Sequence, residues 1–586
     1  MKEKRTRRLL EILPGLISWF IILSLFGLLF INPLVLAVIL IVYLIYWSSK
    51  LLFMTLLLLI ANYRIRSKRN IDWLSDCRAI ESDLKMDEII HVVLYPIYKE
   101  PKKLLQDSLN ALKSINYPRD NMVVALAGED RDEFAVDKLE DVKNEFKGYF
   151  NDIIVTVHPK DAAGEIPSKG ANATYAARKV KDYLESKKYD LKNVIISTFD
   201  ADTCPDKDYF SCLTYHFLTN KKRYQTSFQP FPIYSNNIYR VPAFARVVEI
   251  SSTFCQLAES MRYEKFITFS SHSMSFKTLV EVDYWPCNLV SDDSLIFWKC
   301  FLKFDGDYLT YPLEVPVYMD IAVGRNLWDT IVVQYKQKRR WAWGIENFAF
   351  LGVNFLKHKK IPLFIKIKRL FQLLDSHIDW ATWAIIISFI TPMVLFWSKV
   401  TMKNALVFFN LSYINNAIFN SFTFILVISI IISRQFIPPR PKDVSRFIYV
   451  TFVLQWLLVP FISAFLGSIP SLDAQTRLMF GNYLGFYRTP KRRQSSSPFG
   501  PKVLSETSRG SIIIDISECI FCGMCQRKCP TSAIVVSKEE KTWMVARLRC
   551  ITCGYCVEVC PKKCLRMSNQ YTEPMLTRRE EIYKSA

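Results

Sequence analysis

Eight cysteines near the C-terminal end of the 586-residue chain form two runs with the same spacing. Each run reads C-x2-C-x2-C-x3-C-P, and every cysteine of the second run follows its counterpart by 31 residues. Two cubane iron–sulfur clusters are held by this spacing, with the fourth cysteine of each run ligating the other cluster. We therefore predict one [4Fe-4S] cluster on Cys519, Cys522, Cys525 and Cys560, and a second on Cys550, Cys553, Cys556 and Cys529.

Structural zinc and disulfides are the alternatives for these cysteines. Zinc sites rarely use four thiolates within a stretch of eleven residues, and disulfides do not persist in a reducing cytosol. Gly523 and Gly554 lie inside the two runs and relieve the backbone crowding that converging thiolates create. The pattern favours clusters, and Cys564, outside the repeat, is not expected to be a ligand.

A pair of aspartates follows the apolar stretch 194–199. Asp200 and Asp202 flank Ala201, so on an extended chain both carboxylates point to the same face. Such a pair suits a hard divalent cation bound to a diphosphate. A solvated acidic loop is the ordinary alternative, but a position directly after a buried strand favours a metal site.

A second acidic pair, Asp292 and Asp293, precedes the apolar stretch 294–298, which has the pattern of a helix. A carboxylate at this position can act as a general base toward a hydroxyl group. The alternative is an acid that merely stabilises the N-terminus of the helix through its dipole.

Gln337, Arg340 and Trp341 recur at i, i+3 and i+4, so on a helix they share one face. That face offers an amide, a guanidinium fork and an aromatic platform to a sugar or a diphosphate. A basic juxtamembrane helix, which the neighbouring lysines and arginine would also suit, is the alternative.

Short apolar runs alternate with longer segments of helical pattern in the middle of the chain. The runs that read as strands are 89–94, 122–127, 153–157 and 194–199. This alternation predicts an α/β fold with a doubly wound, mostly parallel sheet, in which ligands gather at the carboxyl ends of the strands. The chemistry is therefore expected just after each run.

Half of the residues are hydrophobic and the mean hydropathy is +0.11, which points to membrane-spanning segments. Two long apolar runs near the N-terminus, separated by Asn32-Pro33, predict a transmembrane helical hairpin, and a cleaved signal peptide is the less favoured alternative. The apolar runs are 16–31, 34–60, 380–397, about 405–433 and 447–466.

The positive charge gathers in clusters that flank these runs, which explains most of the net charge of +21 without nucleic acid. The positive-inside rule places all the clusters in the cytoplasm. One crossing by 447–466 would put the last cluster outside, so we predict that this run, interrupted by Pro460, is a re-entrant or interfacial hairpin, or that a return segment exists near 479–487. The clusters are 2–8, 64–69, 357–369, 434–446 and 488–493.

The segment from about 88 to 493 resembles the membrane-embedded family-2 glycosyltransferases, the group that includes cellulose, chitin and hyaluronan synthases. The resemblance implies a cytoplasmic GT-A domain that uses a nucleotide-sugar donor, most often a UDP-sugar, and a glycan or lipid-linked acceptor. The motifs that carry it are YPIYKE at 95–100, SKGAN at 168–172, DAD at 200–202, DD at 292–293, QKRRW at 337–341 and RTPK at 488–491.

The same resemblance implies a role for each motif. Two departures from the family matter: Ala127-Gly128-Glu129-Asp130 replaces an Asp-rich loop, which leaves the bound base open, and Asp292 in place of Glu remains a rival to Asp293. The implied roles are Pro96 and Glu100 beside the nucleotide, Glu129 or Asp130 facing the base, Lys169 at the diphosphate, Asp200 and Asp202 holding Mg2+ or Mn2+, Asp293 as catalytic base, Gln337, Arg340 and Trp341 at the acceptor and the leaving diphosphate, and 489–491 bordering the site.

The segment 511–571 resembles the two-cluster ferredoxin subunits of membrane-bound hydrogenases and of respiratory complex I, which implies electron transfer. The Ser-, Pro- and Gly-rich stretch 494–510 reads as a flexible linker with a reach on the order of 20 to 25 Å. Three explanations of the fusion stay open: a partner oxidoreductase, redox control of synthesis, or the erroneous joining of two neighbouring reading frames.

The sequence thus predicts a multi-pass protein of the plasma (inner) membrane with its glycosyltransferase and ferredoxin domains in the cytoplasm. The alternative main role is that of a membrane-anchored iron–sulfur electron-transfer subunit whose central domain only binds nucleotide. The predicted divisions are a transmembrane hairpin at 1–62, a GT-A domain at 63–356, interfacial and transmembrane helices at 357–493, a linker at 494–510, a dicluster ferredoxin domain at 511–571 and a tail at 572–586.

Overall fold

The computed structural model describes residues 2–401, 406–485, 487–491, 510–568 and 580–584. The chain divides into two compact units, Met1–Pro498 (unit 1) and Phe499–Ala586 (unit 2). The predicted linker 494–510 lies almost wholly outside the described residues.

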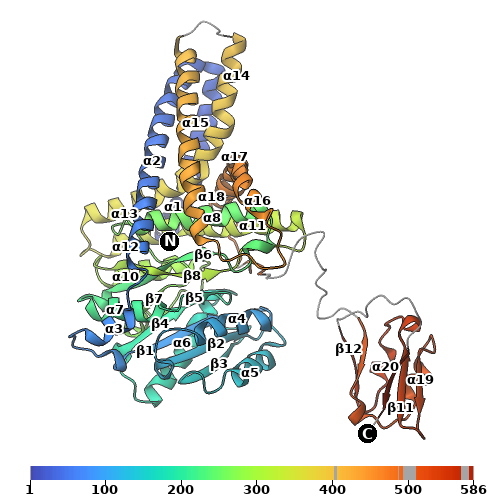
Figure 1. Ribbon diagram of the computed structural model, residues 1–586. Coiled ribbons are helices and arrows are strands. Elements are labelled where there is room, and N and C mark those ends of the chain that lie inside the picture. The colour runs from blue at the N-terminus through green and yellow to red at the C-terminus, as the bar shows by residue number, and fades with distance from the viewer. Residues whose placement is uncertain (1, 402–405, 486, 492–509, 569–579, 585–586) are drawn as a thin grey trace. The chain divides into compact units, whose positions relative to one another are not determined.

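An eight-stranded sheet in the order β3-β2-β1-β4-β7-β6-β8-β5 forms the centre of unit 1 (Figure 1). The four predicted strand runs are β1 to β4, which are mutually parallel, so the predicted α/β sheet is confirmed. β7 pairs antiparallel with β4 and β6, which makes the sheet mixed. The strands are β1 (Ile90–Pro96), β2 (Met122–Glu129), β3 (Asp152–His158), β4 (Val194–Thr198), β5 (Cys204–Pro205), β6 (Thr226–Tyr234), β7 (Ser273–Ser275) and β8 (Leu309–Met319).

The second half of this sheet, β5 to β8, has no clear strand pattern in the amino-acid sequence. β5 and β7 are only two and three residues long, too short to show a pattern. β6 and β8 are long, but each contains prolines, which normally argue against a strand interior. A shift of register between Gln229 and Phe231 accommodates these prolines.

Helices cover both faces of the sheet, and each face has its own hydrophobic core. Val93 and Tyr95 of β1 belong to one core, whereas Val92 and Leu94 belong to the other. Alternate residues of a strand point to opposite faces, so a strand buried on both sides is apolar throughout. The first core includes α4 (Lys102–Lys113), α5 (Ala135–Glu145), α7 (Tyr209–Thr219) and α8 (Ala243–Ser260), and the second includes α6 (Lys169–Ser186), α9 (Phe276–Glu281), α10 (Asp292–Lys303) and α12 (Glu346–Lys357).

Five helical stretches of the described chain are long and apolar enough to cross a membrane: 3–31, 33–68, 363–396, 409–436 and 448–480. The N-terminal hairpin consists of α1 (Lys2–Ile31) and α2 (Pro33–Lys68). Asn32 caps α2 by accepting a hydrogen bond from the N–H of Val35 at 3.2 Å, and the proline suits the first helical position.

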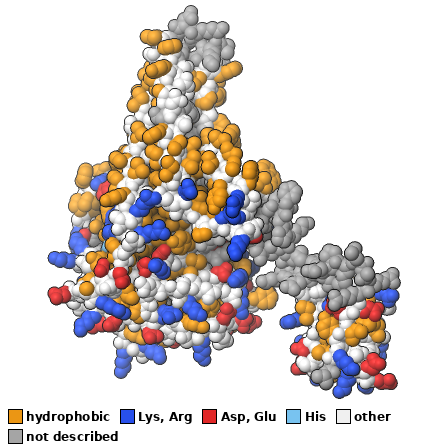
Figure 2. Space-filling view, in the orientation of Figure 1, with side chains coloured by type: hydrophobic (Ala, Val, Ile, Leu, Met, Phe, Trp, Pro, Cys, Tyr) orange, Lys and Arg blue, Asp and Glu red, His pale blue; other side chains and the backbone are white. Residues whose placement is uncertain are grey.

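A column of helices rises above the sheet (Figure 1). α2 packs there against α14 (Thr391–Thr401) and α15 (Leu406–Ser433). Hydrophobic side chains dominate the surface of the column, whereas charged side chains gather below it (Figure 2). α13 (Leu363–Ile385) leads into α14 through a π-helical turn at Ile386–Ile390.

The last apolar run is broken into short helices. α16 (Ile448–Leu454), α17 (Val459–Ile462) and α18 (Ile469–Phe480) follow one another through a 3-10 turn and a π turn, with Pro460 and Pro470 at the breaks. In Figure 1, α16 and α17 stand beside the lower part of the column. The re-entrant hairpin and the return segment stay predictions, and α18 ends where Gly481 adopts φ +75°.

Unit 2 is a small α+β domain whose described residues include the short helices α19 (Met524–Lys528) and α20 (Tyr555–Glu558). β9 (Ile512–Ile514) pairs with β12 (Leu565–Met567), and β10 (Ile534–Ser537) pairs with β11 (Thr542–Ala546). The predicted tail differs from the structure, because Glu580–Lys584 forms strand β13 against β11. Its alternation of exposed and half-buried residues is too short to mark a strand by sequence.

Candidate active site

A cavity of about 370 Å³ opens at the carboxyl ends of β1, β2 and β4. Asp130, one of the two residues predicted to face the base, is exposed and does not line it. The structure therefore gathers residues from six separate motifs around one space. The predicted residues that line it are Pro96, Glu100, Glu129, Lys169, Asp200, Asp202, Asp292, Asp293, Gln337, Arg340 and Trp341.

The N-terminus of α6 places Lys169 in this cavity. Ser168 caps the helix by accepting a hydrogen bond from the N–H of Ala171 at 3.1 Å. Gly170 then lets the helix approach the acidic pair, because a Cβ atom there would lie 2.6 Å from the carbonyl oxygen of Pro286 and 2.9 Å from Cβ of Asp292.

Lys169 connects the two acidic motifs. Its ammonium group donates to Asp200 at 2.7 Å and to Asp293 at 2.9 Å. Burial alone would lower the pKa of Lys169, but the charges of Asp200 and Asp293 outweigh it and raise that pKa. The lysine is therefore held as a cation between the aspartate pair and the candidate base.

The two aspartates of the Asp-Ala-Asp motif have different partners. Asp200 also accepts a hydrogen bond from the hydroxyl of Ser270 at 2.7 Å. Asp202 accepts from the backbone N–H of Asp320 at 2.8 Å and from Lys491 at 2.9 Å. Burial would raise the pKa of Asp200, but Lys169 and Lys491 lower it.

The donor set of this motif fits Mg2+ or Mn2+. Asp200 and Asp202 both line the cavity and offer carboxylate oxygens, the ligands that hard divalent cations prefer. The carboxylates already carry two ammonium partners, so a bound cation would share or replace part of that charge.

The two aspartates at the start of α10 have different surroundings. Asp293 faces Lys169, and its backbone carbonyl accepts a hydrogen bond from Thr268 at 2.7 Å. Asp292 is only 3 % exposed. Burial and the negative charge of Asp293 raise the pKa of Asp292, which favours its protonated form.

The predicted helix around Gln337 is α11 (Leu327–Ala342), and it turns Gln337, Arg340 and Trp341 toward the cavity. The side-chain oxygen of Gln337 is buried and has no hydrogen-bond partner within the described residues. The tilted ring of Tyr234, at the end of β6, lies 6.4 Å from that of Trp341 and lines the same space.

The segment 487–491 closes one side of the cavity. Arg488 pairs with Glu100 at 3.2 Å, and Lys491 reaches Asp202. The backbone of Lys491 also forms an isolated antiparallel β-bridge with Ala322, which follows β8. Burial raises the pKa of Glu100 to about 7, although the charge of Arg488 opposes the shift.

Glu129, at the end of β2, lies beside Tyr98 in the wall of the cavity. It forms an ion pair with Arg131, whose guanidinium lies 4.6 Å from the ring centre of Tyr98. Of the two residues predicted to contact the nucleotide base, Glu129 borders the cavity and Asp130 does not.

Sequence reasoning misses several residues of the site. Ser270 and the backbone of Asp320 support the aspartate pair, and Trp380 of α13 lines the cavity from a candidate membrane span. None of these residues belongs to a spaced motif. Ser270 lies just before β7, Asp320 just after β8 and Trp380 on α13, so only the folded chain brings them to one site.

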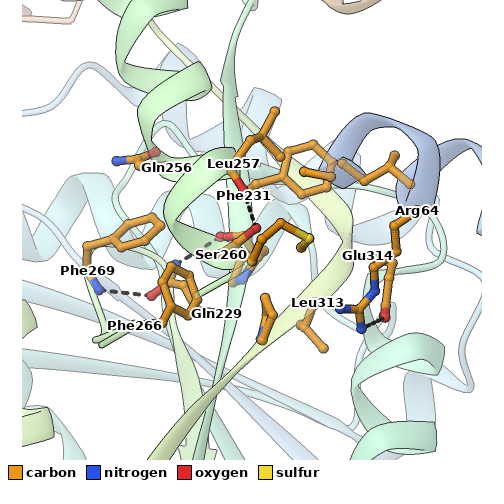
Figure 3. A pocket seen from close by; sticks show the side chains of 15 residues that line it. Arg64, Gln229, Phe231, Gln256, Leu257, Ser260, Phe266, Phe269, Leu313 and Glu314 are labelled. Carbon is orange, nitrogen blue, oxygen red and sulfur yellow. Dashed lines mark hydrogen bonds and ion pairs between the residues drawn. The ribbon is translucent and has the colours of Figure 1, made fainter. Parts of the chain in front are cut away.

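A second group of metal-ligating residue types, Cys212, His216 and Glu314, lies elsewhere in unit 1. Glu314 already accepts hydrogen bonds from Arg64 at 2.5 Å and Lys68 at 2.7 Å, so two cations compensate its charge. Figure 3 shows Arg64 and Glu314 at the edge of a small pocket that also contacts α8. We interpret this cluster as the anchor of α2 on β8.

In unit 2, four of the predicted cluster ligands surround one small cavity. Cys560 from the second run lies there with Cys519, Cys522 and Cys525 from the first. Gly523 and Gly554 adopt φ +70° and +85°, so each supplies the left-handed turn before the helix of its run. Thiolates that meet around a space in this way fit a cubane cluster.

Comparisons with known protein families give a match in each of the two units of the chain. Residues 195–465 match the family described as Glycosyl transferase family group 2, and residues 511–561 match the 4Fe-4S dicluster domain. No curated protein matches the chain.

Solved structures similar to the chain include a mannosyltransferase from Pyrobaculum calidifontis in complex with GDP-Man and Mn2+. It is 15% identical with a TM-score of 0.35, over 66% of this chain and 98% of that one. S. aureus TarS 1–349 in complex with UDP-GlcNAc is 14% identical with a TM-score of 0.31, over 60% of this chain and 93% of that one. From the two family matches, the chain carries a glycosyl transferase family group 2 domain followed by a 4Fe-4S dicluster domain.

Proposed function

We propose that unit 1 is a membrane-bound, metal-dependent, inverting glycosyltransferase that moves a sugar from a nucleotide-sugar donor to a glycan or lipid-linked acceptor. One observation carries the proposal: the residues predicted for the nucleotide, the metal, the base and the acceptor line a single cavity. A domain that only bound nucleotide would not need the acidic pair and Trp341 there. This speaks against the alternative of a purely electron-transferring membrane subunit.

The charges around the cavity support the mechanism. Asp293 would take the proton of the acceptor hydroxyl as that oxygen attacks the anomeric carbon from the face opposite the leaving group, which inverts the carbon. Lys169, Arg340 and Arg488 line the cavity and would bind the departing nucleoside diphosphate. Asp200 and Asp202 would hold Mg2+ or Mn2+, which supplies charge stabilisation of the diphosphate when bound.

We further propose that unit 2 carries two [4Fe-4S] clusters and passes electrons to a redox partner, and that both units face the cytoplasm. Basic clusters beside the apolar helices support this sidedness through the positive-inside rule. Cluster assembly also requires a reducing compartment. The donor in this proposal is a UDP-sugar, and no nucleic acid is involved.

A panel of nucleotide sugars tests the function of unit 1. Membranes that contain the protein are incubated with each donor and with Mg2+ or Mn2+, the released nucleoside diphosphate is measured, and the mass of the product is determined. Release should depend on the metal and disappear in Asp200→Ala and Asp202→Ala. Wild-type release from either purified variant would remove the metal assignment, and no release from any donor would end the proposal.

A further inference from the structure

A buried ion pair joins α8 to α11 beside the cavity, and the mechanism above does not use it. The ammonium of Lys338 lies 3.0 Å from a carboxylate oxygen of Glu249 and 2.9 Å from the hydroxyl of Ser252. Lys338 is 4% exposed and Glu249 is fully buried. Burying two charges costs several kcal/mol per ion before the attraction between them is gained, so the pair is weak as a source of stability.

The same ammonium lies against the aromatic platform of the site. Nζ of Lys338 is 3.6 Å from the ring centre of Trp341, close enough for a strong cation–π contact. Lys338 precedes Trp341 by three residues, so both side chains lie on the same side of α11. Glu249, on α8, holds the ammonium of Lys338 in place, and the ammonium in turn contacts the indole of Trp341.

We propose that Glu249 and Lys338 are positioning residues that hold the indole plane of Trp341 for the acceptor sugar. Stacking of a sugar on an aromatic ring requires a fixed plane, whereas an unsupported indole can turn about its two side-chain torsions. The cation engages the ring on one side, and the indole also lines the cavity that would take the acceptor. The inference rests on the proposed function, because it assigns the acceptor to Trp341.

The position of the pair predicts which kinetic constants it controls. Glu249 and Lys338 do not line the cavity, so the donor should not sense them directly. Gln256, seven residues after Glu249 on α8, does line the cavity, which shows that this face of α8 borders the site. The pair should therefore affect the KM of the acceptor and leave the KM of the donor unchanged.

The test is a double variant, Lys338→Met with Glu249→Leu, because either change alone would leave a buried charge unpaired. Disaccharide probes, namely cellobiose, chitobiose and mannobiose, serve as acceptors, and the one that the wild type uses best is titrated. The acceptor KM should rise by about 5- to 30-fold, the size of one desolvated cation–π contact. Donor KM and slow donor hydrolysis should stay within about two-fold, which also shows that the variant is folded.

A matched control breaks the ion pair made by the next residue of α11, through a change in its partner on α18. Arg339 pairs with Asp473 at 2.8 Å and lies outside the cavity lining. Asp473→Asn therefore breaks an ion pair of α11 without touching Trp341, and the acceptor KM should not change.

A mutant cycle with Trp341→Ala separates positioning from general support. If the pair acts through the indole, the double variant has no further effect on acceptor KM once Trp341 is gone. Additive effects, or an unchanged acceptor KM in the double variant, would overturn the proposal.

A readout without substrate keeps the inference distinct from the proposed function. The fluorescence contribution of Trp341 is isolated by difference from Trp341→Phe, in both the wild-type and the double-variant background, and quenched with acrylamide. Quenching of that contribution should increase in the double variant. An unchanged quenching constant overturns the positioning role, even if the wild type accepts none of the disaccharides. If no nucleotide sugar releases its nucleoside diphosphate, only the proposed function is overturned.

Discussion

At the level of single residues, the site depends on neighbouring carboxylates that differ in protonation and in their charged partners. Lys169 shares its positive charge between Asp200 and Asp293, since it contacts both. Asp292 has no such contact with Lys169 and is almost fully buried. The sequence proposes both members of the pair as bases, and the structure supplies a physical reason to prefer one.

We expect Asp293→Asn to reduce transfer by roughly 100-fold or more, the usual contribution of a general base, while nucleotide binding is retained. Asp292→Asn should cost less than about ten-fold, because asparagine resembles the protonated acid that burial and Asp293 favour. Initial rates of transfer and calorimetric binding of the nucleoside diphosphate check both. The opposite order of the two losses would make Asp292 the base.

Glu100 should make stability depend on pH. Its pKa is raised by burial from 4.5 to about 7, so between these values the folded protein holds a proton that the unfolded chain has lost. Stability should therefore fall as the pH rises from 4.5 through 7, by on the order of 3 kcal/mol from this group. In Glu100→Gln that part of the fall should be absent.

Thermal unfolding in detergent at several pH values measures this effect. Asp130→Asn, at an exposed position outside the cavity lining, is the control and should keep the wild-type dependence. A Glu100→Gln protein with the same pH dependence as the wild type would show that the burial of this carboxyl does not govern its titration.

At the scale of elements, the N-terminus of α6 is the part whose placement matters most. It brings Lys169 between the two acidic motifs, and its approach to α10 requires a residue without a Cβ atom at position 170. The segment 487–491 completes the other wall by ion pairs to Glu100 and Asp202. Both elements are joined to the site by contacts between residues far apart in sequence.

Gly170→Ala should lower stability by about 1 to 3 kcal/mol, the usual cost of overpacking, and should reduce transfer because it moves Lys169 or Asp292. Gly485→Ala is the control, because a Cβ atom there meets nothing within 4 Å. Unfolding temperature and transfer rate are compared for the two variants. Equal values for both would mean that α6 can shift away from α10 at no cost.

At the scale of the whole molecule, two units with separate chemistries share one chain. Each has its own hydrophobic core: the sheet of unit 1 has a core on each face, and Trp543 is at the centre of the core of unit 2. The site cavity and the cysteine cavity each lie within one unit. We therefore expect loss of a cluster to leave glycosyl transfer intact.

Cys522→Ala, prepared anaerobically, should lose about half of the iron and the spectral signal of one of two [4Fe-4S] clusters. Transfer by the same protein should stay within about two-fold of the wild type. Cys564→Ala is the matched control and should keep all its iron, since Cys564 stands outside the repeat although it lines the same cavity. Iron loss from Cys564→Ala would add it to the ligands.

Features that depend on local spacing could be predicted from the amino-acid sequence, because periodicity and turn residues act over a few positions. These features are the cysteine repeat, the helix face of Gln337, Arg340 and Trp341, and the four central strands. Features that depend on contacts between distant residues emerged only when the chain was folded. Folding brought Asp202 to Lys491, Lys338 to Glu249 and the segment 580–584 to β11. Short or proline-containing strands such as β7 and β8 are stabilised by the strands beside them. Their own residues therefore show too weak a pattern to predict a strand.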